Sequence, residues 1–228
     1  MAYYFDFNVI WNSIGMMLGG LGLGLFLAII SLFLGVIFGL VAAFGAVSSK
    51  PILKRLTSTY TALFRNTPLL VLVFLTYFGL PQIGISMNKE VSFIVTLSLY
   101  AGAYMTDVFR AGLQAIPKGI IEAGQTVGLS RFQIRRELQL PIMFKNVLPA
   151  MSNYLISLFK DTSLAATITV HELTYFAIKI NTETFRVFEA WLLAAVLYVL
   201  TCYLIAYILR KVEKRLSAGS RKERRELH

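Results

Sequence analysis

No charged side chain occurs in residues 7–49, a run of 43 residues between Asp6 and Lys50. A helix needs about 20 apolar residues to cross the hydrocarbon core of a bilayer, so this run is more than long enough for one membrane span. No polar turn divides the run, and we therefore expect a single long helix over about residues 18–47. An interfacial segment that carries Trp11 precedes this helix, because tryptophan is enriched where the membrane meets water.

Glycines recur at four-residue spacing within the same run. This spacing lets helix backbones approach closely, either at a dimer face or at a contact within one subunit, and both interpretations stay open. The three pairs are Gly15/Gly19, Gly20/Gly24 and Gly35/Gly39.

Composition agrees with a membrane protein. Hydrophobic residues make up 57% of the chain and charged residues 15%, whereas soluble domains have roughly 25% charged residues. The net charge of +10 is concentrated in short loops and a tail beside apolar runs. This is the positive-inside pattern of membrane proteins and not the basic stripe that nucleic-acid binding requires, so we expect no nucleic-acid partner.

The remaining apolar segments complete an all-α membrane protein with about five transmembrane helices. We expect further helices over about residues 56–80, 91–116, from 146 onward, and 190–209, with residues 171–189 as a polar excursion. Pro68 is expected to kink or open the second of the five helices. Sixteen of the 22 Lys and Arg residues fall in loops and a tail on one side. The N-terminus is therefore expected outside and the C-terminus in the cytosol.

A polar segment from Glu122 to Pro141 interrupts the apolar pattern on the expected cytosolic side. Pro117 suits the first turn of a short helix, and Gly128 can end that helix in a left-handed conformation. Ser130 and Gln133 have the spacing of a capping box for a second helix. Pro141 is then expected to stop or kink the chain before the fourth span. From the residues alone, an amphipathic helix that rests on anionic lipid is an alternative.

Several motifs resemble a known family. The pattern E-A-G-x3-G-x9-L-x-L-P, which ends at Pro141, resembles the EAA loop of ABC-importer permease subunits. The segments RNTPLL, YFGLP, YAGAYMTDVFRAGLQAIPKG and LISLFKDTSLAATITVHEL resemble permeases of polar amino acid importers, and the last is most similar to cystine- and glutamine-type permeases. The resemblance covers about residues 15–212.

This resemblance implies a type I ABC importer permease fold in the bacterial inner membrane. Residues 1–228 would form one transmembrane domain, with residues 117–145 as the cytosolic EAA loop and residues 210–228 as a basic tail on membrane lipid. The implied partners are ABC ATPase subunits, a second permease that is a copy or a paralogue, and an extracytoplasmic substrate-binding protein. The chain has no phosphate-binding loop, so ATP and Mg would be bound by the partner ATPase.

The resemblance also assigns residues to the coupling of transport with ATP hydrolysis. Gly124 stands where the family usually has alanine, and we expect it to loosen the first helix of the loop. The residues expected to contact the ATPase are Glu122, Ala123, Gly124, Gly128, Leu140 and Pro141.

Charged residues within spans mark the expected substrate site, because such charges usually face a cavity or a partner. Lys160 or Arg65 would hold the carboxylate of an amino acid, and Asp161 would hold its ammonium group. Hydrogen bonds would come from Thr162, Ser163, Tyr100 and Tyr104. The alternative is an internal charge network that fixes helix packing without touching a ligand, as Asp107 and Arg110 would form at three-residue spacing.

The sequence thus predicts a transport subunit that forms the path for a polar amino acid. It contains no catalytic constellation and no cluster of metal ligands, so we expect neither an enzyme nor a metal site. A stand-alone ion-coupled carrier or channel is the alternative function. A carrier would be expected to show internal duplication of its spans, and the five expected helices with one specialised loop do not.

Overall fold

The computed structural model describes residues 4–225, and every regular element among them is helical. The helices in chain order are α1 (Asn8–Trp11), α2 (Ile14–Ala46), α3 (Pro51–Asn66), α4 (Leu69–Phe74), α5 (Lys89–Gln114), α6 (Lys118–Thr126), α7 (Arg131–Gln133), α8 (Leu140–Asp161), α9 (Leu173–Thr184) and α10 (Val187–Arg225). Two π-helical segments, η1 (Leu75–Gly79) and η3 (Ile134–Gln139), and two 3-10 helices, η2 (Leu80–Ile83) and η4 (Thr162–Ile168), join them. The all-α fold predicted from the sequence is confirmed. Residues 226–228 of the expected basic tail lie outside the described part.

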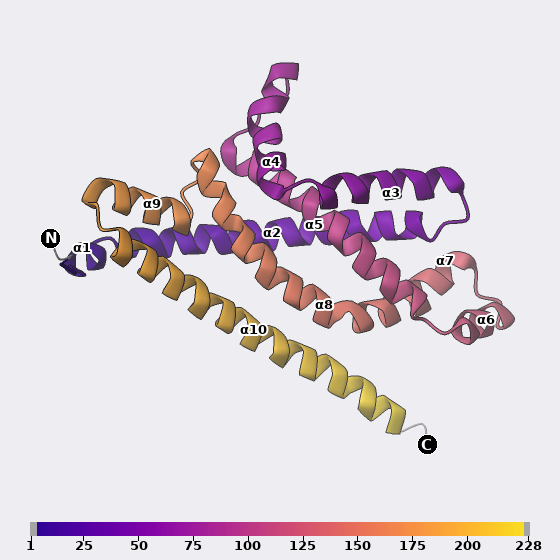
Figure 1. The fold of residues 1–228 in the computed structure, drawn as a ribbon. Helices are drawn as coiled ribbons and strands as arrows, with labels where there is room; N and C mark the ends of the chain where they lie inside the picture. Colours follow the sequence, from indigo (N-terminus) through magenta and orange to yellow (C-terminus); the bar gives the residue numbers. More distant parts are fainter. Residues whose placement is uncertain (1–3, 226–228) are drawn as a thin grey trace.

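Helix α2 is the long first helix that the uncharged run predicts, and α5 packs along it in the middle of the bundle (Figure 1). Gly35 and Gly39 lie at this contact. A Cβ atom added to Gly39 would be 2.5 Å from the Cβ of Met105. Gly20 and Gly24 likewise face the backbone of Glu172 and the hydroxyl of Thr162. Two of the three glycine pairs therefore serve packing within the subunit.

The second expected span is broken instead of merely kinked. Helix α3 ends at Asn66, and its axis makes an angle of 103° with the segment Leu69–Ile83. Thr67 and Pro68 have extended ψ values of 130° and 134° between the two helices. Proline disfavours the helical conformation in the residue before it, which explains the sharp corner at Thr67. The segment that begins with α4 consequently turns away from α3 (Figure 1), although Leu69 and Val73 of α4 pack in the core.

Pro141 does not stop the chain before the fourth span, and the helical chain bends between α7 and α8 instead (Figure 1). The chain stays helical from Arg131 to Asp161, so α8 begins at Leu140 and not near Asn146. A proline in α-helix clashes with the carbonyl four residues earlier. The wider π-helical turn of η3 directly precedes α8 and relieves that clash. The polar excursion over residues 171–189 contains α9.

Three helices, α2, α5 and the part of α10 up to Arg215, are long and apolar enough to cross a membrane, or four spans if the bent pair α3 and α4 counts as one. Helix α8 has the length of a span at 22 residues. It is too polar to pass the same test, since it carries Lys145, Asn146, Asn153, Lys160 and Asp161. The N- and C-terminal ends of the described chain lie at opposite ends of the bundle (Figure 1).

Candidate functional site

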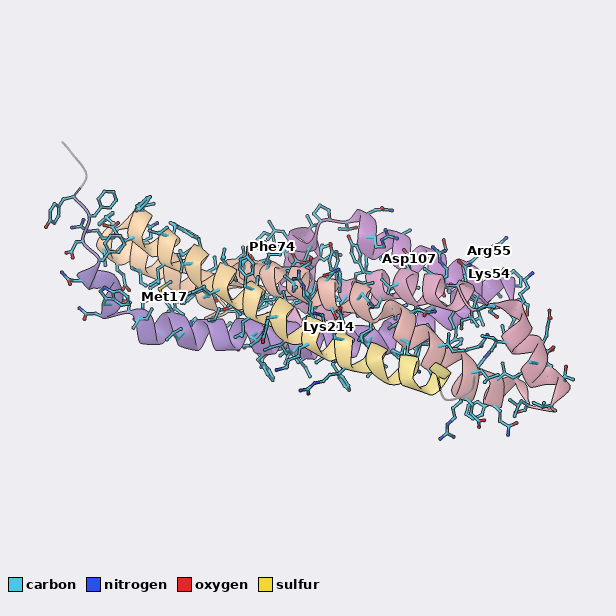
Figure 2. All side chains as sticks on the ribbon, turned by 90° about the horizontal axis from the view of Figure 1, so that it is seen from below. Met17, Lys54, Arg55, Phe74, Asp107 and Lys214 are labelled. Atoms are coloured by element: carbon cyan, nitrogen blue, oxygen red, sulfur yellow. The ribbon has the colours of Figure 1, made fainter. Side chains whose placement is uncertain are left out.

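Asp107 joins two arginines at a partly exposed position on α5. Its carboxylate accepts a hydrogen bond from Arg65, at the end of α3, and forms an ion pair with Arg110, one turn further along α5. The Arg110 Nη2 to Asp107 Oδ1 distance is 2.8 Å. Figure 2 shows Asp107 part-way along the bundle, between Met17 near one end and Lys54 and Arg55 toward the other. One carboxylate shared by two guanidinium groups leaves this cluster with a net positive charge.

Three tyrosines continue from the arginine cluster. The guanidinium carbon of Arg65 lies 5.2 Å from the ring centroid of Tyr104, a cation–π contact. Tyr100 donates a hydrogen bond to the Tyr104 hydroxyl over 3.2 Å. On its other side, the Tyr104 ring stacks on Tyr154 of α8 at 5.4 Å between centroids. The structure therefore brings Arg65, Tyr100 and Tyr104 together, as expected from the sequence, and adds Tyr154.

The adjacent residues Lys160 and Asp161 point in different directions. Asp161 lies within electrostatic range of Tyr100 and Tyr154. Lys160 is exposed and is close enough to Cys202 on α10 to interact with it electrostatically. Successive helical residues are about 100° apart around the axis, so one of the pair faces the tyrosines and the other does not. A substrate site that uses both charges must extend around α8.

Thr162 and Ser163 differ in what they can offer. Thr162 is fully buried, and its hydroxyl donates to the carbonyl of Phe159 over 2.7 Å. Its proton is engaged by Phe159 in this arrangement, and its predicted hydrogen bond to a substrate stays a prediction. Ser163 is only partly buried, and its predicted role stays a prediction.

An exposed polar stripe on α8 was missed in the sequence. Its members follow one another at spacings of seven, four and three residues, which places them on one helix face: Asn146, Asn153, Ser157 and Lys160. Polar side chains at membrane depth face a cavity, water or a partner, and not lipid. The spacing is a detectable signal, but the expected site is built around charged residues and their neighbours, and Asn146, Asn153 and Ser157 carry no charge.

The loop after α5 forms a compact two-helix knob. Gly128 has φ +84°, and its N–H donates to Gln125 while that of Leu129 donates to Gly124. These two bonds form a Schellman motif at the end of α6. Ser130 and Gln133 form the expected capping box at the start of α7. The left-handed Gly128 and the capping box are both confirmed.

Gly124 lies where the first helix of the knob meets η3. It is buried, and a Cβ atom there would be 2.9 Å from Cδ1 of Leu138. The glycine therefore lets α6 pack closely against η3, and its expected loosening of the helix stays a prediction. Glu122 and Ala123 remain exposed.

The outer surface of the knob is partly apolar, whereas its base is attached to the bundle. Val127 is 76% exposed and Phe132 69% exposed. At the base, Leu140 is partly buried and packs against the core, Pro141 is exposed, and the guanidinium of Arg135 lies 5.4 Å from the ring centroid of Phe44 on α2. The knob thus combines exposed apolar side chains with a fixed position relative to α2 and α8.

Comparison with known proteins identifies the family. Residues 35–218 match the family described as the inner membrane component of binding-protein-dependent transport systems. The chain belongs to this family. It is a transport component of the bacterial inner membrane and not itself an enzyme.

Individual relatives narrow the family to permeases of amino-acid ABC importers, which is the class of this chain. The chain is 32% identical over 214 residues to the glutamine transport system permease GlnP of Escherichia coli K12, covering 93% of this chain and 98% of GlnP. It is 31% identical over 215 residues to the arginine transport system permease ArtQ of Bacillus subtilis, covering 94% of this chain and 98% of ArtQ.

Solved structures agree with this class. A crystal structure of an amino acid ABC transporter with histidines matches with a TM-score of 0.85 at 30% identity, covering 93% of this chain and all of that chain. An inward-facing structure of the MetNI methionine ABC transporter matches with a TM-score of 0.77 at 22% identity over 90% of this chain and 98% of that chain, which supports the type I importer permease fold.

Proposed function

We propose that this permease forms the translocation path for a polar amino acid of the glutamine or cystine type, and that its cytosolic knob couples the path to an ABC ATPase. The observation that carries the proposal is the joined set of Arg65, Asp107, Arg110 and the tyrosines within membrane helices. Charged groups at membrane depth are costly unless they serve a path or a partner.

The charges suit a zwitterionic ligand. The two arginines and Asp107 leave a positive charge beside the tyrosines, which attracts a carboxylate. Asp161, on the other side of the tyrosines, attracts an ammonium group. The polar stripe on α8, which ends at Lys160, then lines the route by which the amino acid passes along the helix.

The knob supplies the mechanical contact. Its exposed Glu122, Ala123, Val127 and Phe132 form a mixed polar and apolar surface suited to a cleft on a partner. The partner ATPase binds ATP and Mg, and its closure moves the knob and shifts the permease between outward- and inward-open states. A second permease, identical or paralogous, completes the path. An extracytoplasmic binding protein delivers the substrate, and residues 210–228 rest on anionic lipid.

Reconstitution tests the transport half of the proposal. The complex of permease and ATPase in liposomes, with its loaded binding protein, should import one or more of glutamine, cystine, histidine, arginine and glutamate only when ATP is inside. Asp161→Ala should reduce this uptake strongly. Transport by the permease alone without ATP would instead indicate a carrier or channel, and wild-type uptake by Asp161→Ala would exclude a binding role for Asp161.

Substitutions at Gly128 test the coupling half. Gly128→Val places a β-branched residue at positive φ, where it is strained, and should separate ATP hydrolysis from uptake or release the ATPase while membrane insertion persists. Gly128→Asn is the matched control, because asparagine tolerates this conformation. Normal transport by Gly128→Val would contradict the assigned role of the knob.

A further inference from the structure

Tyr154 carries a buried hydroxyl that has no hydrogen-bond partner within the described part of the chain. Buried polar groups in proteins are nearly always paired, so an unpaired phenol is unfavourable unless a ligand or another molecule supplies its hydrogen-bond partner. Three serine hydroxyls share this property, those of Ser31, Ser92 and Ser98. They differ from Tyr154 because a serine in a helix can turn its hydroxyl onto a carbonyl of the preceding turn. A tyrosine hydroxyl lies too far from its own backbone to do so.

The neighbours of Tyr154 leave its proton available. Tyr60 donates its own hydroxyl to the carbonyl of Leu99 over 2.6 Å. Tyr100 and Tyr104 share one hydrogen bond, which uses one of their two phenol protons. One proton of that pair and the proton of Tyr154 are therefore free to be donated.

These two protons come from rings held side by side. The rings of Tyr104 and Tyr154 are inclined by only 27°, and they belong to α5 and α8. Arg65 lies over the Tyr104 ring, so the local charge favours an anionic acceptor. A carboxylate has two oxygens and accepts only, which matches two phenol donors beside a guanidinium.

We propose that Tyr154 is a substrate-binding residue whose hydroxyl, together with that of Tyr104, donates hydrogen bonds to the α-carboxylate of the transported amino acid. Asp161, within electrostatic range of Tyr154, then lies where it can attract the ammonium group of the same molecule. This inference rests on the proposed function and adds the residue that fixes the orientation of the amino acid.

Tyr154→Phe tests the inference with the loss of a single oxygen atom and retention of the stacked ring. The probe is the radiolabelled amino acid that the reconstituted wild-type complex imports fastest from glutamine, cystine, histidine, arginine and glutamate. We expect ATP-driven uptake by Tyr154→Phe to fall about tenfold, the effect of losing one hydrogen bond to a charged group. Uptake should fall more than ATP hydrolysis does, because the defect lies in holding the substrate.

Ser98→Ala is the matched control, since it removes another buried, unpaired hydroxyl from α5. It should transport like the wild type. Tyr104→Phe provides a second variant that keeps its ring, and it too should lower uptake more than ATP hydrolysis. Wild-type uptake by Tyr154→Phe, or an equal fall in uptake and hydrolysis, would overturn the inference while leaving the proposed function intact. Absence of ATP-driven import in the wild-type complex would instead refute the proposed function.

Discussion

Helices α8 and α10 pack against each other, but their exposed faces differ in chemistry. The outward side chains of α10 include Leu200, Tyr203 and Leu204, which are 60%, 73% and 58% exposed. Those of α8 include Asn153 and Ser157. Lipid tolerates apolar and aromatic side chains, whereas polar groups at membrane depth require water or a protein partner. Under the proposed function, the exposed face of α10 is directed at lipid and the polar stripe on α8 is directed at the path.

The largest effects are expected from lysine substitutions, which test whether the exposed faces of α10 and α8 have different surroundings. Leu200→Lys places a charge on the face of α10 directed at lipid and should reduce insertion and folding, since a lysine at mid-membrane costs about 3 kcal/mol. Ser157→Lys should insert normally but block transport, because the charge faces the path. The measurements are the membrane-inserted amount of each variant and its uptake in liposomes. Equal insertion of both variants would show that α10 does not face lipid.

Cysteine labelling sharpens the same comparison. The chain has one cysteine, Cys202, so Cys202→Ser gives a background without thiols. In this background, a membrane-impermeant maleimide should label Ser157→Cys about ten times faster than Leu200→Cys, because reaction requires water around a thiolate. Similar labelling rates at the two positions would mean that the stripe on α8 is not in contact with water.

The smallest expected effect is that of a substitution at Glu172, which connects α10 to the segment after α8. Glu172 is fully buried in the connection between the spans. It accepts hydrogen bonds of 2.8 Å from the Tyr198 hydroxyl of α10 and from the N–H of Tyr175. Burial raises the pKa of Glu172 to about 7, from an ordinary value of 4.5.

Between pH 4.5 and 7 the folded chain therefore holds a proton at Glu172 that the unfolded chain releases. The free energy of unfolding should fall as the pH rises through this window. Glutamine at position 172 can occupy the same place without ionising. Between pH 4.5 and 7, the thermal midpoint of Glu172→Gln should therefore change by a few degrees less than that of the wild type. Glu183→Gln, exposed on α9, is the control. An unchanged pH profile in Glu172→Gln would contradict the raised pKa.

Local signals predicted much of the fold. The uncharged run gave α2, the Ser130 and Gln133 pattern gave a capping box, and Gly128 gave a left-handed helix end. The capping box and the helix end depend on residues within one or two turns of each other, and the uncharged run is one continuous stretch of sequence. Predictions at prolines were less successful, because the outcome depends on the neighbouring geometry. Pro68 accompanies a 103° break, whereas Pro141 lies inside a continuous helix after a π-helical turn.

For the candidate site, the sequence identified the residue types but not their arrangement. Arg65, Asp107, Arg110, Tyr100 and Tyr104 were all predicted as charged or polar groups within spans. The pair of Asp107 and Arg110 was predicted from its three-residue spacing, but the pairing of Asp107 with Arg65 was not, since those two residues are 42 residues apart. Tyr154 was missed because tyrosine is also a common packing residue, and nothing local shows that its hydroxyl lacks a partner.

The sequence by itself determined that the chain is an all-helical membrane protein of the importer family, because apolar length, caps and the EAA motif are local properties. Only the tertiary structure decided that Asp161 faces the tyrosines while Lys160 faces away, and that two arginines share Asp107. The physical reason is that packing sets how far each helix is rotated about its own axis. Where a helix is apolar around much of its circumference, its sequence does not specify which side meets which neighbour, and packing at positions such as Gly35 and Gly39 makes that choice.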